Sequence, residues 1–401
     1  MTHLYVEPIF VDKEDETLYK SKRIRIDGKS FETPIISYDM TVFRSSDRVV
    51  PQTRGLNEIY QLMGTEKVPI RKLMSDTKAE KDFDVRLQTK LNRTDSANEV
   101  NIGILESEVL SYPSGKELEY LLNTALIISD IVPIPNFHNI TTNIDSDFRF
   151  LEYTTFLETV ISNVESYKNR KPIMGVIPKL SWTNTEKLVN FYVDKGLNAF
   201  YVDFAARNSI TAQRDFLHVF GVLQEHDLIE KSFVYAFNVD AGRLSKNATV
   251  VHARDILSYG FGFDAMGRKH RRVKAGSDTW RKINTLPNRV RLFNRYDYGY
   301  HKILEVEKIK EIYPHGSCIS LEKLLSNFKS DVHELRRCEN LLNSEQLGLE
   351  ANNLKGVIKN EKLTDYLAHK TYVKLVDLKT MTKFRKSLSK TAKPKWEDWF
   401  S

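Results

Sequence analysis

Short apolar runs alternate with amphipathic segments from residue 100 onward, and this alternation is the strongest architectural pattern in the 401-residue chain. Near-continuous apolar runs are typical of strands buried on both faces, whereas apolar residues spaced three and four apart indicate helices that bury one side. The runs recur about every 25 to 40 residues, as strands do in the repeating strand–helix units of a parallel sheet. We predict such strands at 100–105, 127–135, 172–178, 199–204, 232–240 and 260–264.

Helical periodicity fills the intervals between these strands. We predict helices at 115–126, 148–167, 184–195, 211–225 and 249–259. A further strand at 33–38 makes seven, and one more strand hidden in the polar segment 41–99 would close an eight-stranded ring. That segment shows only weak helical periodicity, around Leu56, Ile59 and Met63. The predicted fold class is therefore α/β, a (β/α)8 TIM barrel.

The two ends of the chain depart from this repeat. Residues 4–11 and 22–26 alternate as paired strands do before a turn. Amphipathic segments at 321–342 and 354–384 predict helices that become more basic toward the C-terminus. We predict three parts, an N-terminal β-hairpin region at 1–30, a TIM barrel at 31–310 with an insertion at about 41–99, and a basic helical C-terminal extension at 311–401.

The positive charge of the chain is concentrated in two segments. Residues 268–295 contain ten basic residues and one acidic residue, and residues 370–395 contain nine and one. Such clusters favour a nucleic acid or another polyphosphate, because cationic side chains displace condensed counterions from a phosphate chain; a solvated cationic face is the alternative. No apolar signal segment and no apolar run of about 18 residues is present. We therefore expect a cytoplasmic protein without a membrane span, in the host cytoplasm if it is phage-encoded.

Candidate chemistry lies at the predicted carboxyl ends of the strands, where TIM barrels place their active sites. Neither common Gly-rich phosphate motif is present, so no nucleotide cofactor is expected. The two cysteines and the histidines lack ligand spacing, so no metal is expected. The polar residues at these strand ends are Asp39, Glu106, Asn136, Lys179, Asp203, Asp240 and Asp264.

Several segments follow the motifs of a known family in the same order along the chain. Residues 23–34 are similar to a hairpin that runs into E-T-P and the first barrel strand, and residues 105–112 fall where that family has a D-S-G-x-F-Q turn. Residues 130–132 and 174–177 are similar to its D-I and G-x-V-Q strands, and residues 260–264 to the G-x-D-x-F-D strand that carries the nucleophile. On these motifs the chain resembles the tRNA-guanine transglycosylase superfamily, TIM barrels that exchange an encoded guanine for a 7-deazaguanine base.

The resemblance implies a reaction in two displacements. Asp264 would attack C1′ of the nucleoside as guanine leaves, and the incoming base would then open the covalent glycosyl-enzyme. Glu106 would move the proton, at a position where the family has Asp. Asn136 aligns with the family's base-reading Asp, Lys179 stands near an expected Gln, and the family's zinc ligands are missing. The residues predicted to contact the substrate are Ser107, Asn136 and Lys179, together with Asp203 and Asp240 on their predicted positions at strand ends. Those expected to hold the phosphate backbone are Arg268, Lys269, Arg271, Arg272 and Lys274.

The substrate expected from this resemblance is DNA. The chain beyond residue 330 leaves no evident room for an appended RNA-binding domain, which favours the branch of the superfamily that inserts 7-deazaguanines such as preQ0 into DNA. Three alternatives stay open: a tRNA-guanine transglycosylase, a non-catalytic nucleic-acid-binding paralogue, and an unrelated TIM-barrel enzyme that acts on small phosphorylated substrates. The sequence also leaves open whether a second copy or a partner subunit completes the site.

Overall fold

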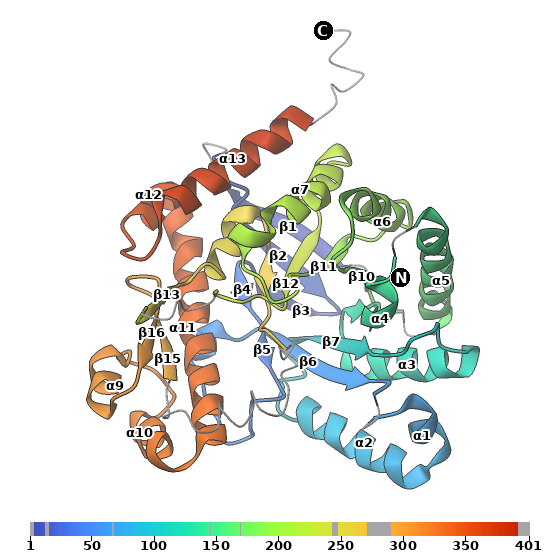
Figure 1. Ribbon diagram of the computed structural model, residues 1–401, viewed down its shortest axis with the longest axis horizontal. Coiled ribbons are helices and arrows are strands. Elements are labelled where there is room, and N and C mark those ends of the chain that lie inside the picture. Colours follow the sequence, from blue (N-terminus) through green and yellow to red (C-terminus); the bar gives the residue numbers. More distant parts are fainter. Residues whose placement is uncertain are drawn as a thin grey trace.

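Two parallel sheets form the centre of the fold (Figure 1). The computed structural model describes residues 4–12, 16–65, 68–144, 146–168, 170–242, 248–270 and 290–391. The first sheet has the order β4 (Ile35–Ile36), β14 (Ala265–Met266), β12 (Phe233–Phe237), β11 (Ala199–Asp203), β10 (Ile173–Ile177), β8 (Val132–Pro133). The second has the order β5 (Tyr38–Asp39), β6 (Leu56–Met63), β7 (Val100–Ser107), β9 (Asn136–Phe137). Every pair of neighbours is parallel, so the carboxyl ends of the strands gather at one edge of each sheet.

Helices lie around the outside of these strands (Figure 1). They are α1 (Ile70–Ser75), α2 (Thr77–Leu91), α3 (Gly115–Ile128), α4 (His138–Thr141), α5 (Asp147–Ser166), α6 (Trp182–Asp194) and α7 (Ser209–Glu225). The packing of α6 shows why local sequence allows this arrangement. Ser181 caps α6 by accepting from the backbone amide of Asn184, and the buried Tyr192 ring lies against β10. A Cβ atom on Gly175 would come within 2.6 Å of that ring, so the strand must carry glycine at this contact.

The remaining elements are two antiparallel sheets and a C-terminal group of helices. One sheet joins β1 (Tyr5–Val11), β2 (Lys20–Ile26) and β3 (Lys29–Glu32); the other has the order β13 (Val250–His252), β16 (Gly299–Ile303), β15 (Val290–Asn294). The helices are α9 (Val306–Ile312), α10 (Leu321–Ser330), α11 (Val332–Asn360), α12 (Leu363–Ala368) and α13 (Leu375–Thr391). Two 3-10 helices, η1 (Pro51–Thr53) and η2 (Ile256–Phe261), complete the described elements. Helix α11 packs against β4 and β15.

The predicted α/β class with parallel strands is confirmed, and the hidden strand in 41–99 is found at β6. The weak helical periodicity in that stretch was misleading. Leu56, Ile59 and Met63 are all fully buried, but Glu58 and Tyr60 between them also point into the interior, toward other polar groups. Polar residues on an inward face hide the alternation that marks a strand.

The predictions of a helix at 249–259 and a strand at 260–264 are wrong. Residues 250–252 form β13, and η2 occupies residues 256–261, which include the first two residues of the run that was expected to be extended. Gly262, at φ 97°, ends η2 in a left-handed conformation that favours glycine. The strand β14 therefore begins only at Ala265, and Asp264 precedes it instead of ending it.

Candidate functional site

Strands β6, β7 and β9 bring together a buried carboxylate, near the carboxyl end of β7, and its donors. Glu106 lies opposite Asn136 in the β7–β9 ladder. The Tyr60 hydroxyl donates to Glu106 Oε2 over 2.5 Å, and the Asn136 amide donates to Glu106 Oε1 over 3.3 Å. Asn136 Oδ1 and Ser107 Oγ are buried and accept no hydrogen bond from any described residue. Unsatisfied buried acceptors are costly, so these two atoms are suited to a ligand that brings donors.

A second cluster surrounds His270, four residues beyond the end of β14. Its ring stacks on Tyr60, with ring centres 4.2 Å apart and planes 12° apart, and on Phe237, at 5.5 Å and 15°. His270 Nε2 hydrogen-bonds to Glu58 Oε1, and its Nδ1 lies 3.8 Å from an Asp39 carboxylate oxygen. Burial opposes protonation of His270, but the negative charges of Glu58 and Asp39 outweigh it and raise the pKa of His270 above its usual value.

Asp203, which ends β11, is connected to the same cluster. Its Oδ1 accepts from the Ala205 backbone amide at 2.8 Å and from the Asn238 side-chain amide at 3.2 Å. Asn238 Oδ1 in turn accepts from the His270 backbone amide at 2.9 Å. A cavity of about 360 Å³ beside Asp203 is also lined by the exposed Lys179. The structure thus brings together two of the residues predicted to contact substrate.

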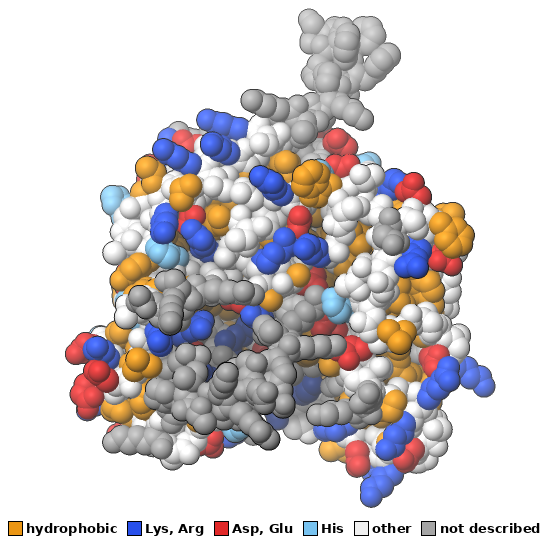
Figure 2. Space-filling view, viewed as in Figure 1, with side chains coloured by type: hydrophobic (Ala, Val, Ile, Leu, Met, Phe, Trp, Pro, Cys, Tyr) orange, Lys and Arg blue, Asp and Glu red, His pale blue; other side chains and the backbone are white. Residues whose placement is uncertain are grey.

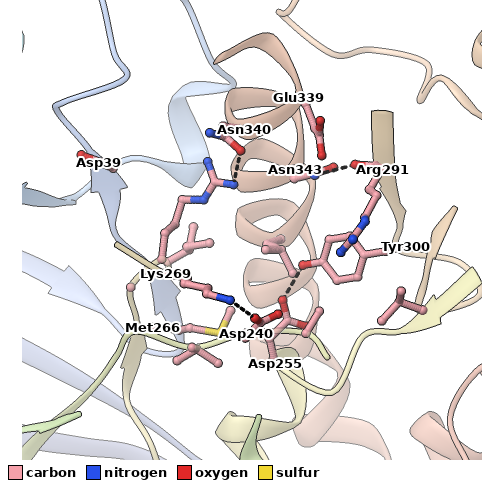
Figure 3. A pocket seen from close by; sticks show the side chains of 17 residues that line it. Asp39, Asp240, Asp255, Met266, Lys269, Arg291, Tyr300, Glu339, Asn340 and Asn343 are labelled. Atoms are coloured by element: carbon pink, nitrogen blue, oxygen red, sulfur yellow. Dashed lines mark hydrogen bonds and ion pairs between the residues drawn. The ribbon is translucent and has the colours of Figure 1, made fainter. Parts of the chain in front are cut away.

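Asp240, another predicted substrate contact, lies in a different cavity of about 220 Å³ between β14, β16 and α11 (Figure 3). The Lys269 ammonium points to the Asp240 carboxylate at 2.5 Å. Arg268 also turns toward this cavity and donates to Asn340 Oδ1 over 2.6 Å. Both predicted phosphate-binding cations therefore have protein partners here.

Asp255 also lines this cavity. Its carboxylate accepts from the Tyr300 hydroxyl (Figure 3) and from the Ile256 amide. Burial raises the pKa of Asp255 to about 6, because a charged carboxylate loses its water there.

Asp264 lies away from all of these groups, at the amino ends of the strands. Its backbone amide donates to Val234 O, next to the first residue of β12. Its side chain is fully buried, and its Oδ2 accepts from Lys22 Nζ at 2.9 Å and from the Val234 amide at 2.8 Å. The prediction that Asp264 ends the last strand is therefore wrong. An apolar run in the sequence shows that a segment is buried but not at which end of the strand its acid lies.

Sequence reasoning also missed several residues of the site. Glu58, Tyr60 and His270 were not predicted to contribute, and Tyr235 and Phe237 were treated only as members of an apolar strand. One usable signal was present: aromatic residues two apart, as at 235 and 237, project to the same side of a strand. Arg271, Arg272 and Lys274 lie outside the described residues. Figure 2 shows Lys and Arg side chains on one face of the molecule, interspersed with Asp and Glu.

Two further kinds of feature are absent from the described residues. They contain no group of three or more His, Cys, Asp or Glu side chains placed to hold a metal ion. No helix among them has the length and apolar character needed to cross a membrane.

Comparisons with known proteins assign no family. No model of a protein family matches the sequence, and no curated protein does so either. Among solved structures, the chain is similar to a monomeric dihydrodipicolinate synthase variant, with 11% identity over 71% of this chain and 95% of that chain, at a TM-score of 0.23. It is also similar to the enoyl reductase domain of MlnA from the macrolactin biosynthesis cluster of Bacillus amyloliquefaciens, with 8% identity over 84% of this chain and 94% of that one, at a TM-score of 0.28. Likenesses this distant assign neither a fold nor a function.

Proposed function

We propose that this protein is an enzyme that exchanges guanine in a nucleic acid for a 7-deazaguanine base, with its active site at the carboxyl ends of the parallel strands. The observation that carries the proposal is one continuous set of contacts between two buried carboxylates. Tyr60 donates to Glu106 and stacks on His270, and the His270 backbone amide donates to Asn238, which donates to Asp203. Carboxylate pairs perform glycosyl transfer, and flat rings accept a base that has left its stack.

The scaffold that we propose for this site is a closed (β/α)8 barrel. The two parallel sheets are continuous along the chain at both seams, because only Ser37 separates β4 from β5 and only residues 134–135 separate β8 from β9. A parallel bridge between Ile102 and Ile131 also spans the second seam. With each interrupted pair counted as one strand, the neighbours form a ring. Barrels of this kind carry their chemistry at the carboxyl ends of the strands.

In the proposed first step, the Asp203 carboxylate attacks C1′ of the target nucleoside and the bond from C1′ to the guanine nitrogen breaks. The departing guanine takes the electron pair and receives a proton from Glu106. In the second step, Glu106 accepts the proton of the incoming base, whose nitrogen attacks C1′ and releases Asp203. The reaction is balanced without an oxidant or a reductant.

Asp203 takes the role that the sequence resemblance implied for Asp264. A nucleophile must reach the substrate, and the Asp264 carboxylate is fully buried against Lys22 at the opposite ends of the strands. Asp203 instead borders the cavity of about 360 Å³ that Lys179 also lines. DNA remains the preferred substrate and tRNA the alternative, both on the sequence resemblance alone.

The experiment that tests this function is base exchange by the purified chain. Labelled preQ0 is incubated with the protein and either duplex DNA or tRNA, and we expect label to appear in the DNA. The Glu106→Gln variant should slow the exchange by about 10²- to 10⁴-fold, the usual contribution of a general acid–base group. Glu119→Gln removes the same charge from an exposed position on α3 and should leave the rate unchanged.

The covalent intermediate provides the second measurement. An adduct trapped on a denaturing gel and mapped by mass spectrometry should lie on Asp203; an adduct on Asp264 would refute the proposed mechanism. Label in tRNA alone would refute the DNA substrate but support base exchange. Binding of nucleic acid without label or adduct would identify a non-catalytic paralogue, an interpretation that the burial of Asp264 favours.

A further inference from the structure

The His270 side chain occupies a position shaped for a flat ring. Its imidazole is only 7% exposed and lies nearly parallel to the rings of both Tyr60 and Phe237. These two aromatic residues come from different strands, β6 and β12. Stacking on aromatic rings is tolerant of ring identity, because any flat heterocycle offers a π face. The two stacking rings therefore select for any flat ring, and a further group must distinguish one heterocycle from another.

Glu58 supplies this chemical selectivity. Its carboxylate is fully buried, and one of its two oxygens is already hydrogen-bonded to another protein side chain. Tyr235 donates its hydroxyl to Glu58 Oε2, and Ser37 Oγ lies 2.7 Å from the same hydroxyl. The other oxygen, Oε1, receives the His270 Nε2 contact. A buried carboxylate needs a donor on each oxygen. Any molecule that replaces the imidazole must therefore present a ring N–H toward Oε1.

The backbone before His270 is packed tightly onto the same carboxylate. A side chain on Gly267 would collide with the Tyr235 hydroxyl and with Glu58 Oε2. Gly267 thus allows the backbone after β14 to pass close to Glu58 and Tyr235, which positions His270 over the carboxylate.

We propose that Glu58, Tyr60 and Phe237 form a binding site for a flat nitrogen heterocycle of the guanine type, which His270 fills until such a base displaces its ring. Guanine and 7-deazaguanine carry a ring N–H beside an amino group, so they can donate to Glu58 where His270 now does. Free adenine carries its ring N–H at N9, away from its amino group, so it cannot present the two donors side by side and should bind less well. The identity of the heterocycle rests on the proposed function, whereas the site itself is defined by the contacts of His270.

The test is binding of free 7-deazaguanine, measured by calorimetry without any nucleic acid. If the site is vacated in about one molecule in ten, His270→Ala should tighten binding about tenfold, because the apparent affinity scales with the open fraction. Adding Glu58→Gln to that variant should abolish the gain, and adenine should show no comparable gain. His301→Ala is the matched control, since His301 also pairs with a carboxylate, Asp297 at 2.8 Å, but lies on β16.

Unchanged binding of 7-deazaguanine by a folded His270→Ala variant would overturn the proposal, with folding judged by circular dichroism and the unfolding midpoint. A tenfold gain in a protein that shows no base exchange would support this site while refuting the proposed function. A loss of exchange without any gain in binding would make His270 a participant in the chemistry and not the occupant of a ligand site.

Discussion

The ionisation of Asp255 should make the stability of the fold depend on pH. Its pKa is raised from 3.8 to about 6 in the folded protein, so the folded state disfavours the ionised carboxylate. The stabilising contribution of this group is therefore complete below about pH 4 and is lost as the pH rises toward 6. Two pKa units correspond to about 3 kcal/mol. Asp255→Asn, which keeps an acceptor for Tyr300, should remove this fall in the free energy of unfolding.

Urea unfolding of the wild type and of Asp255→Asn at pH 4 and pH 7 checks this prediction. The difference between the two proteins should shift by about 3 kcal/mol in favour of the variant between the two pH values. Asp82→Asn, an exposed change on α2, should show no such shift. Parallel pH profiles for wild type and Asp255→Asn would mean that the buried carboxylate is solvated in solution.

Sequence reasoning located some residues of the candidate site and missed others. Glu106 and Asp203 were placed correctly near the carboxyl ends of strands, because each follows a run of apolar residues that forms a strand, whereas Asn136 is the first residue of β9. Glu58 was missed because it lies inside a strand, where a charged residue is unexpected. Its burial depends on Tyr235 and His270, which are 177 and 212 residues away along the chain. No local pattern carries that information.

At the scale of elements, the packing of α11 on β4 depends on one glycine. A Cβ on Gly348 would lie 2.7 Å from the Thr53 Cβ atom and 3.2 Å from Ile36, both of which are buried. Gly348→Ala should therefore lower the free energy of unfolding by about 1 to 3 kcal/mol, the usual cost of overpacking. Gly356→Ala lies in the same helix with nothing within 4 Å, and it should raise stability by up to about 1 kcal/mol because alanine favours the helix.

Comparing the denaturant unfolding midpoints of the two alanine variants tests this prediction, since both substitutions make the same chemical change in one helix. Equal stabilities would show that α11 does not approach β4 as closely as the structure indicates. The sequence did not predict this contact. We predicted helices at 321–342 and 354–384, but α11 runs continuously across the gap between them. Buried polar residues such as Asn343 and Glu345 interrupt the apolar period there.

The repeat of strands and helices was predictable because each strand has a continuous apolar run and each helix has apolar residues spaced three and four apart. β7, β10, β11 and β12 fall within or beside the predicted runs. The last unit was mispredicted because η2 is buried on every side, so it has no helical stripe. Burial from all directions gives the same pattern in a strand and in a short helix.

At the scale of the whole molecule, the Lys22–Asp264 pair joins the N-terminal antiparallel sheet to the amino ends of the parallel strands. Both side chains are fully buried, and Lys22 also donates to Ser232 O. Lys20 lies beside them with its ammonium buried and no hydrogen-bond partner among the described residues, and burial holds its pKa well below the usual value. The two buried ammonium groups therefore depend strongly on the carboxylate of Asp264, with a smaller attraction from Glu230.

Asp264→Asn should consequently destabilise the fold by about 3 to 5 kcal/mol, the cost of leaving a buried charge without its partner. Adding Lys22→Met removes the unpaired ammonium, while the side-chain amide introduced by Asp264→Asn still offers an oxygen to the Val234 amide, so most of the lost stability should return. Urea unfolding measures both changes, and the labelled-base assay is run on the same samples. Exchange that recovers with stability in the double variant is expected if Asp264 is structural. A double variant that is as stable as the wild type but forms neither product nor adduct would return the nucleophile to Asp264, and with it the mechanism that the sequence alone suggested.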